Sequence, residues 1–136
     1  MVPLGRARIA REGSDVTVVA YGAMVPLAER AATELAGEAT SIEVLDLRTL
    51  KPLDEDALLA SVAKTGRAVV VQEAPRTCGY AAEIAAILAE KAILDLRGPI
   101  LRVTGYDVPY PYWKLEDAYM PSVARVADAV RKLLEF

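Results

Sequence analysis

Three consecutive valines at residues 69–71 constrain the fold of this chain more than any other feature. A strand with no polar alternation over its middle is apolar on both faces, which is typical of a central parallel strand covered by helices on each side. Pro75 ends this strand because it removes a backbone donor. Gly79 then lets the chain turn, and an alanine-rich helix is predicted from Ala81. We expect the rest of the chain to be arranged around this strand, turn and helix.

Strands and helices alternate on both sides of that unit. Other strands are predicted over residues 15–22, 41–47 and 100–104. Helices are predicted from residue 25 to about Gly37, between the N-cap Asp54 and Gly66, from Ala81 to about Leu96, and from Pro121 onward. Residues 1–13 are expected to form a linker arm or a short edge strand, and residues 14–136 one domain. This alternation predicts an α/β fold with a parallel sheet and helices on both faces.

Composition excludes several classes of protein. The net charge of -3 comes without any run of Lys or Arg, which argues against nucleic acid as a partner. The apolar stretches are too short to span a membrane, and the N-terminus lacks the apolar core of a signal peptide, so we expect a soluble, cytoplasmic protein. The hydrophobic fraction of 54% exceeds the usual ~45–50%, which predicts that some apolar surface lies at an interface.

The chain contains no histidine and one cysteine, Cys78. A disulfide within the chain, a multi-thiolate metal site and nucleophile activation by imidazole are therefore excluded. Cys78 is interpreted as a bystander, since no second thiol or imidazole accompanies it.

Charged side chains gather where the predicted strands end. In open α/β sheets, ligands and partners bind at the carboxyl ends of strands. The residues expected at this edge are Asp46, Arg48, Gln72, Glu73, Arg76, Thr77 and Asp107. Opposite charges there could hold a small anion or form an acid-base pair. The favoured alternative is that Arg48 and Arg76 neutralise the carboxylates and tie the loops together.

The segment from Gly105 to Lys114 is rich in aromatic residues and stiffened by two prolines. Tyr and Trp are enriched at interface hot spots, so a protein partner is the preferred interpretation. Packing of these aromatic side chains against their own domain is the alternative.

Five motifs occur in an order that resembles a known family. They are EGSDVTVVAYG at residues 12–22, EVLDLRTLKPLD at 43–54, KTGR at 64–67, QEAP at 72–75 and RVTGYDVPYPY at 102–112. Together they resemble the C-terminal domain of the β subunit of a 2-oxo acid dehydrogenase E1 component, of the pyruvate or branched-chain type. The resemblance covers the chain from Leu4 onward.

That resemblance implies a transketolase C-terminal-like fold, a three-layer α/β/α sandwich whose mostly parallel sheet has one antiparallel strand. It also implies a parent enzyme that uses thiamin diphosphate and Mg²⁺ to decarboxylate a 2-oxo acid and acylate the lipoyl group of E2. In the family, the α subunit and the preceding β-subunit domain hold the cofactor. We therefore expect no catalytic, cofactor-binding or metal-binding residue in this chain, and no turnover from it alone.

The partners implied by the resemblance are the E1 α subunit, a second E1 β subunit and the peripheral subunit-binding domain of E2. The residues assigned to the subunit interface are Gln72, Glu73, Arg76, Tyr106, Asp107, Tyr110, Tyr112 and Trp113. Glu135 and Phe136 are assigned to E2 docking. Two departures stand out: Gln72 replaces a histidine of many relatives, and Arg97 occupies a stretch where many have an acidic residue.

Two other functions remain open from the sequence. The first is a stand-alone regulatory module that binds a small anion through Glu73, Arg76 and Asp107. The second is the same domain in another thiamin enzyme, such as a transketolase or a ferredoxin-linked oxidoreductase. The chain is expected to be either an excised fragment or a natural product.

Overall fold

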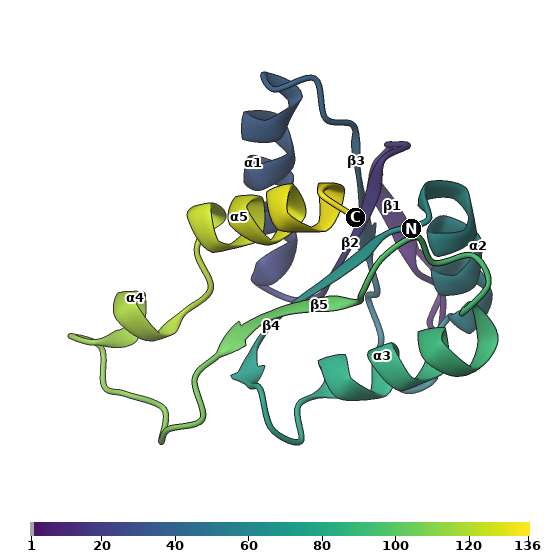
Figure 1. The fold of residues 1–136 in the computed structure, drawn as a ribbon. Helices are drawn as coiled ribbons and strands as arrows, with labels where there is room; N and C mark the ends of the chain where they lie inside the picture. The colour runs from purple at the N-terminus through teal and green to yellow at the C-terminus, as the bar shows by residue number, and fades with distance from the viewer. Residues whose placement is uncertain (1) are drawn as a thin grey trace.

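The computed structural model describes residues 2–136, which form a five-stranded sheet in the order β1-β3-β2-β4-β5 (Figure 1). The strands are β1 (Arg8–Arg11), β2 (Val16–Ala20), β3 (Ile42–Asp46), β4 (Ala68–Pro75) and β5 (Leu101–Gly105). Strands β2 to β5 are parallel, and β1 pairs antiparallel with β3 at one edge. Residues 8–11 therefore belong to the sheet as its edge strand. The predicted fold class, a mostly parallel sheet with one antiparallel strand, is confirmed.

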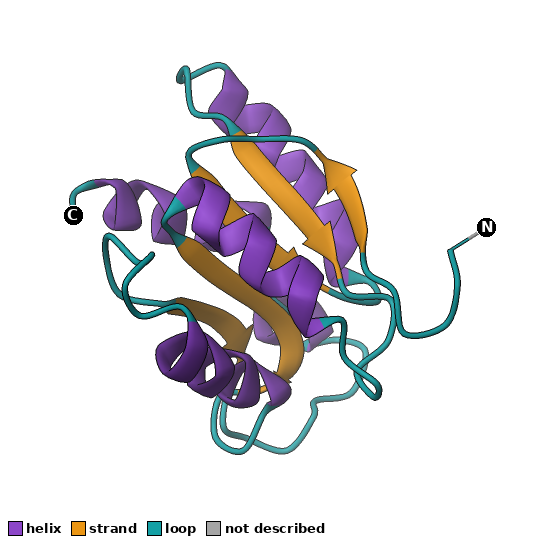
Figure 2. Ribbon diagram, turned by 90° about the vertical axis from the view of Figure 1, so that its right-hand side faces the viewer, coloured by secondary structure: helices purple, strands orange, loops and turns teal. Residues whose placement is uncertain are grey.

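Helices cover both faces of the sheet. They are α1 (Met24–Ala36), α2 (Glu55–Thr65), α3 (Tyr80–Lys91), α4 (Glu116–Tyr119) and α5 (Val123–Leu134). Buried residues of α1 and α5 pack on one face of the sheet, and those of α2 and α3 pack on the other (Figures 1 and 2). The result is a three-layer α/β/α sandwich.

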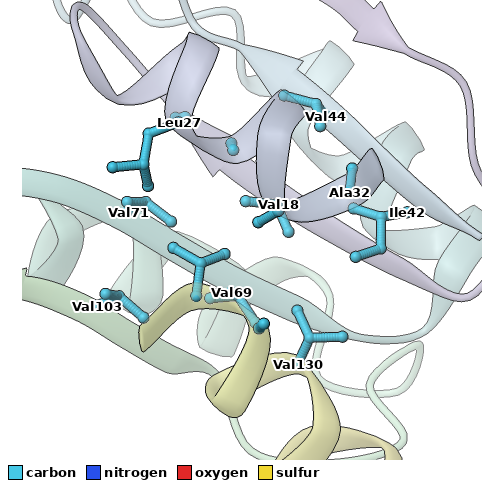
Figure 3. Packing of buried hydrophobic residues seen from close by; sticks show 14 of the residues in the cluster. Val18, Leu27, Ala32, Ile42, Val44, Val69, Val71, Val103 and Val130 are labelled. Carbon is cyan, nitrogen blue, oxygen red and sulfur yellow. The ribbon is translucent and has the colours of Figure 1, made fainter. Parts of the chain in front are cut away.

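The valine run of β4 is explained by its two packed faces. Val69 and Val71 point toward α1 and α5, where they meet Val18, Ile42 and Val103 (Figure 3). Ala68 and Val70 point to the opposite side and pack with the residues of α2 and α3. Because successive side chains of a strand face opposite ways, only an apolar run satisfies both layers. β4 is an interior strand as predicted, although β2 occupies the middle of the sheet.

The predicted helix boundaries hold for α1, which ends at the C-cap Gly37, and for α2, but they fail at the end of α3 and near the C-terminus. The Asp54 carboxylate accepts a hydrogen bond from the Ala57 amide at 3.2 Å, which caps α2, and the helix ends at Gly66. α3 ends at Lys91, whereas the sequence predicted about Leu96. The reason is a long-range contact: the Arg97 amide donates to the Gly66 carbonyl at 2.8 Å, so the chain must leave the helix early to return to the sheet.

Two further differences lie near the C-terminus. The short helix α4 was not predicted, because four residues show no helical period. α5 begins at Val123 and not at Pro121, since the Ser122 hydroxyl accepts from the Arg125 amide at 3.2 Å and caps the helix there. Within residues 2–136, no helix has the length and apolarity needed to cross a bilayer.

Candidate functional site

The loops that follow β4 and β5 lie together at the carboxyl edge of the sheet, below the first turn of α5 in Figure 1. They carry six of the eight residues predicted for the subunit interface, and the other two, Gln72 and Glu73, lie in the last part of β4. Glu135 and Phe136 lie at the opposite edge, because α5 runs back along β5 and brings Phe136 against Gly98, just before that strand. The structure thus separates the predicted sites into two surfaces.

Gln72 differs from the other predicted interface residues because its side chain is fully buried. Its amide oxygen accepts from the Ala81 backbone amide at 2.6 Å and from the Tyr21 hydroxyl at 3.3 Å. Its amide nitrogen donates to the carbonyls of Pro75 at 2.8 Å and Ala74 at 3.3 Å. Gln72 therefore joins the end of β4 to the start of α3 and holds the loop from within.

Gly79 is required by that arrangement. A Cβ atom at this position would lie 2.0 Å from the Gln72 amide nitrogen and 2.4 Å from the Pro75 carbonyl oxygen. The backbone of Gly79 is extended, with φ at -77°. The sequence interpretation, that Gly79 serves to let the chain turn, is therefore wrong, and its role is to let the loop approach Gln72.

Asp107 joins the two loops. Its carboxylate accepts from the Thr77 backbone amide at 2.9 Å and from the Thr77 hydroxyl at 2.7 Å. The hydrogen bond from the Thr77 backbone amide, and then the one from the Thr77 hydroxyl, lower the pKa of Asp107 from its usual value. Arg76 and Arg102 add a reciprocal pair, in which each guanidinium donates to the other residue's carbonyl at 3.3 Å.

The alternative, that Arg48 and Arg76 neutralise the carboxylates and tie the loops together, holds in part: Arg48 pairs with Asp46, whereas Arg76 ties the loops through a carbonyl and forms no ion pair with a described carboxylate. Asp107 is committed to Thr77, and Arg76 to a carbonyl. At the other end of the edge, the buried Asp46 carboxylate pairs with Arg8 at 3.3 Å and Arg48 at 3.6 Å. These contacts leave few charges for a small anion.

Glu73 is the exception among these carboxylates. No described residue donates a hydrogen bond to its side chain or forms an ion pair with it within 4.0 Å, and the residue is half-buried. Burial, and then the nearby charge of Glu73, raise the pKa of Tyr21. The Glu73 carboxylate is thus free to accept a hydrogen bond from another molecule, and it lies near Tyr21.

Tyr119, which the sequence did not single out, organises the aromatic segment. It is 4% exposed, and the rings of Tyr106 and Tyr110 pack edge-on against it, with centroids 6.4 Å and 5.0 Å away. The Arg125 guanidinium lies over the Tyr106 ring at 4.9 Å and donates to the Thr104 carbonyl at 2.6 Å. The aromatic segment therefore has a defined conformation and is anchored to α5 and β5.

Two further contacts fix this structure. A Cβ at Gly105 would lie 2.4 Å from the Tyr119 hydroxyl and 2.3 Å from the Glu73 carbonyl, so only glycine fits beneath the ring. The Tyr110 hydroxyl donates to the Glu116 carboxylate. This hydrogen bond is the main reason that the pKa of Tyr110 is raised to about 12.

The far end of the segment is uncovered. Tyr112 is 92% exposed and Trp113 is 77% exposed, and the Lys114 ammonium lies 5.5 Å from the centroid of the Trp113 ring. Tyr106 and Tyr110 therefore pack against their own domain, as the alternative expected. Tyr112 and Trp113 face outward, and a protein partner for them stays a prediction. Large aromatic groups held exposed on a fixed backbone are typical of a protein interface.

Among residues 2–136, no three His, Cys, Asp or Glu side chains lie close enough to hold a metal ion. The carboxylates of this edge are either committed to the protein's own groups, as Asp107 is, or isolated, as Glu73 is. The donor set of this edge does not fit a bound Mg²⁺.

Known proteins resemble this chain along nearly all of its length. Residues 5–126 match the family model "Transketolase, C-terminal domain". Pyruvate dehydrogenase E1 component subunits β from Staphylococcus epidermidis and Bacillus subtilis are 47% and 46% identical to it over 135 residues. These matches cover 99% of this chain and 42% of each relative, so the chain spans about two-fifths of their length.

A solved structure shows the same arrangement. A split-gene transketolase, described as an inactive β4 tetramer, superposes with a TM-score of 0.84 at 33% identity. The superposition covers 96% of this chain and 42% of that one.

Proposed function

Since the chain belongs to the transketolase C-terminal domain family, we propose that it is the C-terminal assembly domain of a pyruvate dehydrogenase E1 β subunit. The parent enzyme would decarboxylate pyruvate with thiamin diphosphate and Mg²⁺ held outside this chain, and would acylate the lipoyl group of E2. This domain would hold the subunits together.

The observation that carries the proposal is the exposed aromatic surface at the carboxyl edge. Tyr112 and Trp113 stand on a backbone fixed by Tyr119, Gly105 and the Asp107–Thr77 contact. A fixed surface loses little conformational freedom when a partner binds, which favours affinity. In this proposal the contact made by Tyr112 and Trp113 is surrounded by Tyr106, Tyr110 and Arg76. Gln72 acts indirectly, by holding the loop.

Glu73 has a separate place in the proposal. Its carboxylate has no counter-ion among the described residues. We assign it to a cationic group of the E1 α subunit, because a half-buried carboxylate is stabilised by a partner of opposite charge.

We propose that E2 binds at the opposite edge. Phe136 is 64% exposed and Glu135 is also exposed, so both are accessible to a small basic domain. Charge reversal by Glu135→Lys is expected to weaken binding of the E2 peripheral subunit-binding domain, and calorimetry would measure the change. Equal affinity for the variant and the natural protein would remove Glu135 from the docking site.

A chimera tests the assembly role. The Bacillus subtilis β subunit would carry this chain in place of its own matching two-fifths and would be produced with its α subunit. We expect a stable complex that releases CO₂ from pyruvate. The Trp113→Ala chimera should lose the complex, whereas Lys132→Ala on the exposed side of α5 should keep it. A folded chimera that never binds the α subunit would contradict the proposal.

The chain alone provides the complementary test. Mixed with thiamin diphosphate, Mg²⁺ and pyruvate, it is expected to release no CO₂ above background. Measurable release would show that the reacting centre lies within these residues, against the proposal.

A further inference from the structure

Two arginines lie together at the amino edge of the sheet, where β4 and β5 begin. Arg67 directly precedes β4, and Arg97 lies four residues before β5. The Arg97 amide donates to the Gly66 carbonyl at 2.8 Å, which holds the two segments side by side. The Arg97 side chain crosses Gly66, where a Cβ atom would lie 2.8 Å from the Cδ and Nε atoms of Arg97. We call Arg67 and Arg97 the arginine pair.

Neither member of the arginine pair has a counter-ion within residues 2–136. No carboxylate of that range forms an ion pair with either guanidinium group within 4.0 Å, although Asp95 and Glu135 are exposed. The Arg67 Nε atom is buried and has no hydrogen-bond partner. A buried donor without an acceptor is rare in folded proteins and needs an explanation. Two unneutralised cations on neighbouring segments also repel each other. The arginine pair therefore lacks an anionic acceptor that the described residues do not supply.

The arginine pair adjoins the surface proposed for E2. Gly98 follows Arg97 and packs against Phe136, since a Cβ atom at Gly98 would lie 3.1 Å from the Phe136 Cβ. Arg67 lies two residues before Val69, so alternation along the strand directs its side chain to the face on which α5 packs. The arginine pair and Phe136 therefore belong to one surface.

The backbone that carries the arginine pair is held in place. The Arg67 carbonyl accepts from the Thr17 amide at 2.9 Å and from the Thr65 hydroxyl at 3.1 Å. The Arg97 segment is held by its hydrogen bond to Gly66. Groups fixed in advance lose little freedom when a partner binds, and the planar guanidinium matches the geometry of a carboxylate. The arginine pair is thus suited to bind a carboxylate of another molecule.

We propose that the arginine pair binds an acidic side chain of the E2 peripheral subunit-binding domain. This inference rests on the proposed E2 contact and deepens it: Glu135 meets a cation of that domain, while the arginine pair meets an anion. The pair then determines which E2 domain is accepted. A domain that presents only cations to this edge is repelled, because like charges brought together disfavour the wrong partner.

Calorimetry of the intact 136-residue chain with the E2 domain of the same organism tests the sign of the interaction. Arg97 is exposed, so its replacement leaves the core unchanged. Arg97→Gln should weaken binding by about threefold and Arg97→Glu by about tenfold. Lys114→Glu, the same charge change at the carboxyl edge, should leave the affinity unchanged. Equal or tighter binding by the Arg97→Glu chain would overturn the proposal, because a purely cationic partner would gain from the added carboxylate.

Nuclear magnetic resonance tests Arg67 without replacing a half-buried residue. The Nε–H signal of each arginine reports on the hydrogen bonding of its own guanidinium group. When the E2 domain is added, the Nε–H signals of Arg67 and Arg97 should shift downfield, because both groups donate to a carboxylate. The signal of Arg30, exposed on α1, should stay where it is. Unshifted signals of Arg67 and Arg97 in the complex would overturn the proposal.

A charge exchange identifies the partner residue. Each acidic residue of the E2 domain would be replaced by lysine in turn, and one of these variants should restore binding to the Arg97→Glu chain. Failure of every exchange would overturn the contact. An E2 domain that does not bind the natural chain would also overturn it, together with the assignment of Glu135 to docking. The chimera experiment involves only the α subunit, so the proposed assembly role would still stand.

Discussion

Replacing Gln72 by methionine is the sharpest test of how the carboxyl edge is held. Methionine has a similar length and no hydrogen-bonding amide, so Gln72→Met removes the hydrogen bonds and keeps most of the packing. The two short bonds, from Ala81 at 2.6 Å and to Pro75 at 2.8 Å, matter most. The Ala81 amide is buried and would lose its partner, whereas Pro75 is exposed and its carbonyl can turn to water.

The expected loss of stability in Gln72→Met follows from the burial of these groups. The buried Ala81 amide left without a partner costs about 1–3 kcal/mol, and loss of the short bond to Pro75 costs about 0.5–1.5 kcal/mol. We expect the free energy of unfolding to fall by roughly 2–4 kcal/mol, out of a total of about 5–15 kcal/mol. In urea this corresponds to a midpoint lower by roughly 1–2 M.

Leu88→Met is the matched control, because Leu88 is fully buried in α3 and forms no side-chain hydrogen bond. Exchange of leucine for methionine usually costs less than about 1.5 kcal/mol. If Gln72→Met unfolds at the same urea concentration as Leu88→Met, the hydrogen bonds of Gln72 do not hold the loop, and our reasoning about this edge fails.

Two further predictions concern the aromatic segment. Gly105→Ala should lower the free energy of unfolding by about 1–3 kcal/mol, because its Cβ would lie 2.4 Å from the Tyr119 hydroxyl. The control Gly37→Ala, at a helical φ of -65°, should change the free energy of unfolding by less than about 1 kcal/mol. Urea unfolding compares the two variants, and equal stability would contradict the close approach of Gly105 to Tyr119. Glu116→Gln should bring the pKa of Tyr110 down from about 12 toward its ordinary 10, as read from tyrosinate absorbance. Because the pKa of Tyr110 is higher in the folded state, its contribution to stability is present below about pH 10 and is lost as the pH rises through about 12. The variant should therefore show a smaller alkaline loss, and an unchanged tyrosinate titration would refute the Tyr110–Glu116 hydrogen bond.

Local patterns in the sequence were enough to predict the layers of the fold. The valines at 69–71 can be buried only between two helical layers, and Asp54 caps α2 through a hydrogen bond three residues away. Such features depend on neighbours in the chain, which the sequence displays directly.

The features that the sequence did not predict depend on distant contacts. Tyr119 is buried because Gly105, fourteen residues earlier, leaves room for its ring. α3 stops at Lys91 because Arg97 binds the carbonyl of Gly66. Gln72 was placed at the correct edge, but its burial depends on the return of the chain at Ala81. A groove of about 450 Å³ likewise lies between α1 and α4, elements about ninety residues apart.

The central claim is that the aromatic surface at the carboxyl edge holds the subunits of an E1 enzyme together. Oxidative side-chain footprinting tests it, by comparing the chimeric α/β complex with the isolated chain at concentrations where the chain is monomeric. We predict that Tyr112 and Trp113 are strongly protected in the complex, and that exposed Leu94, in the turn that follows α3, reacts equally in both. Unchanged reactivity of Tyr112 and Trp113 in an assembled complex would contradict the claim.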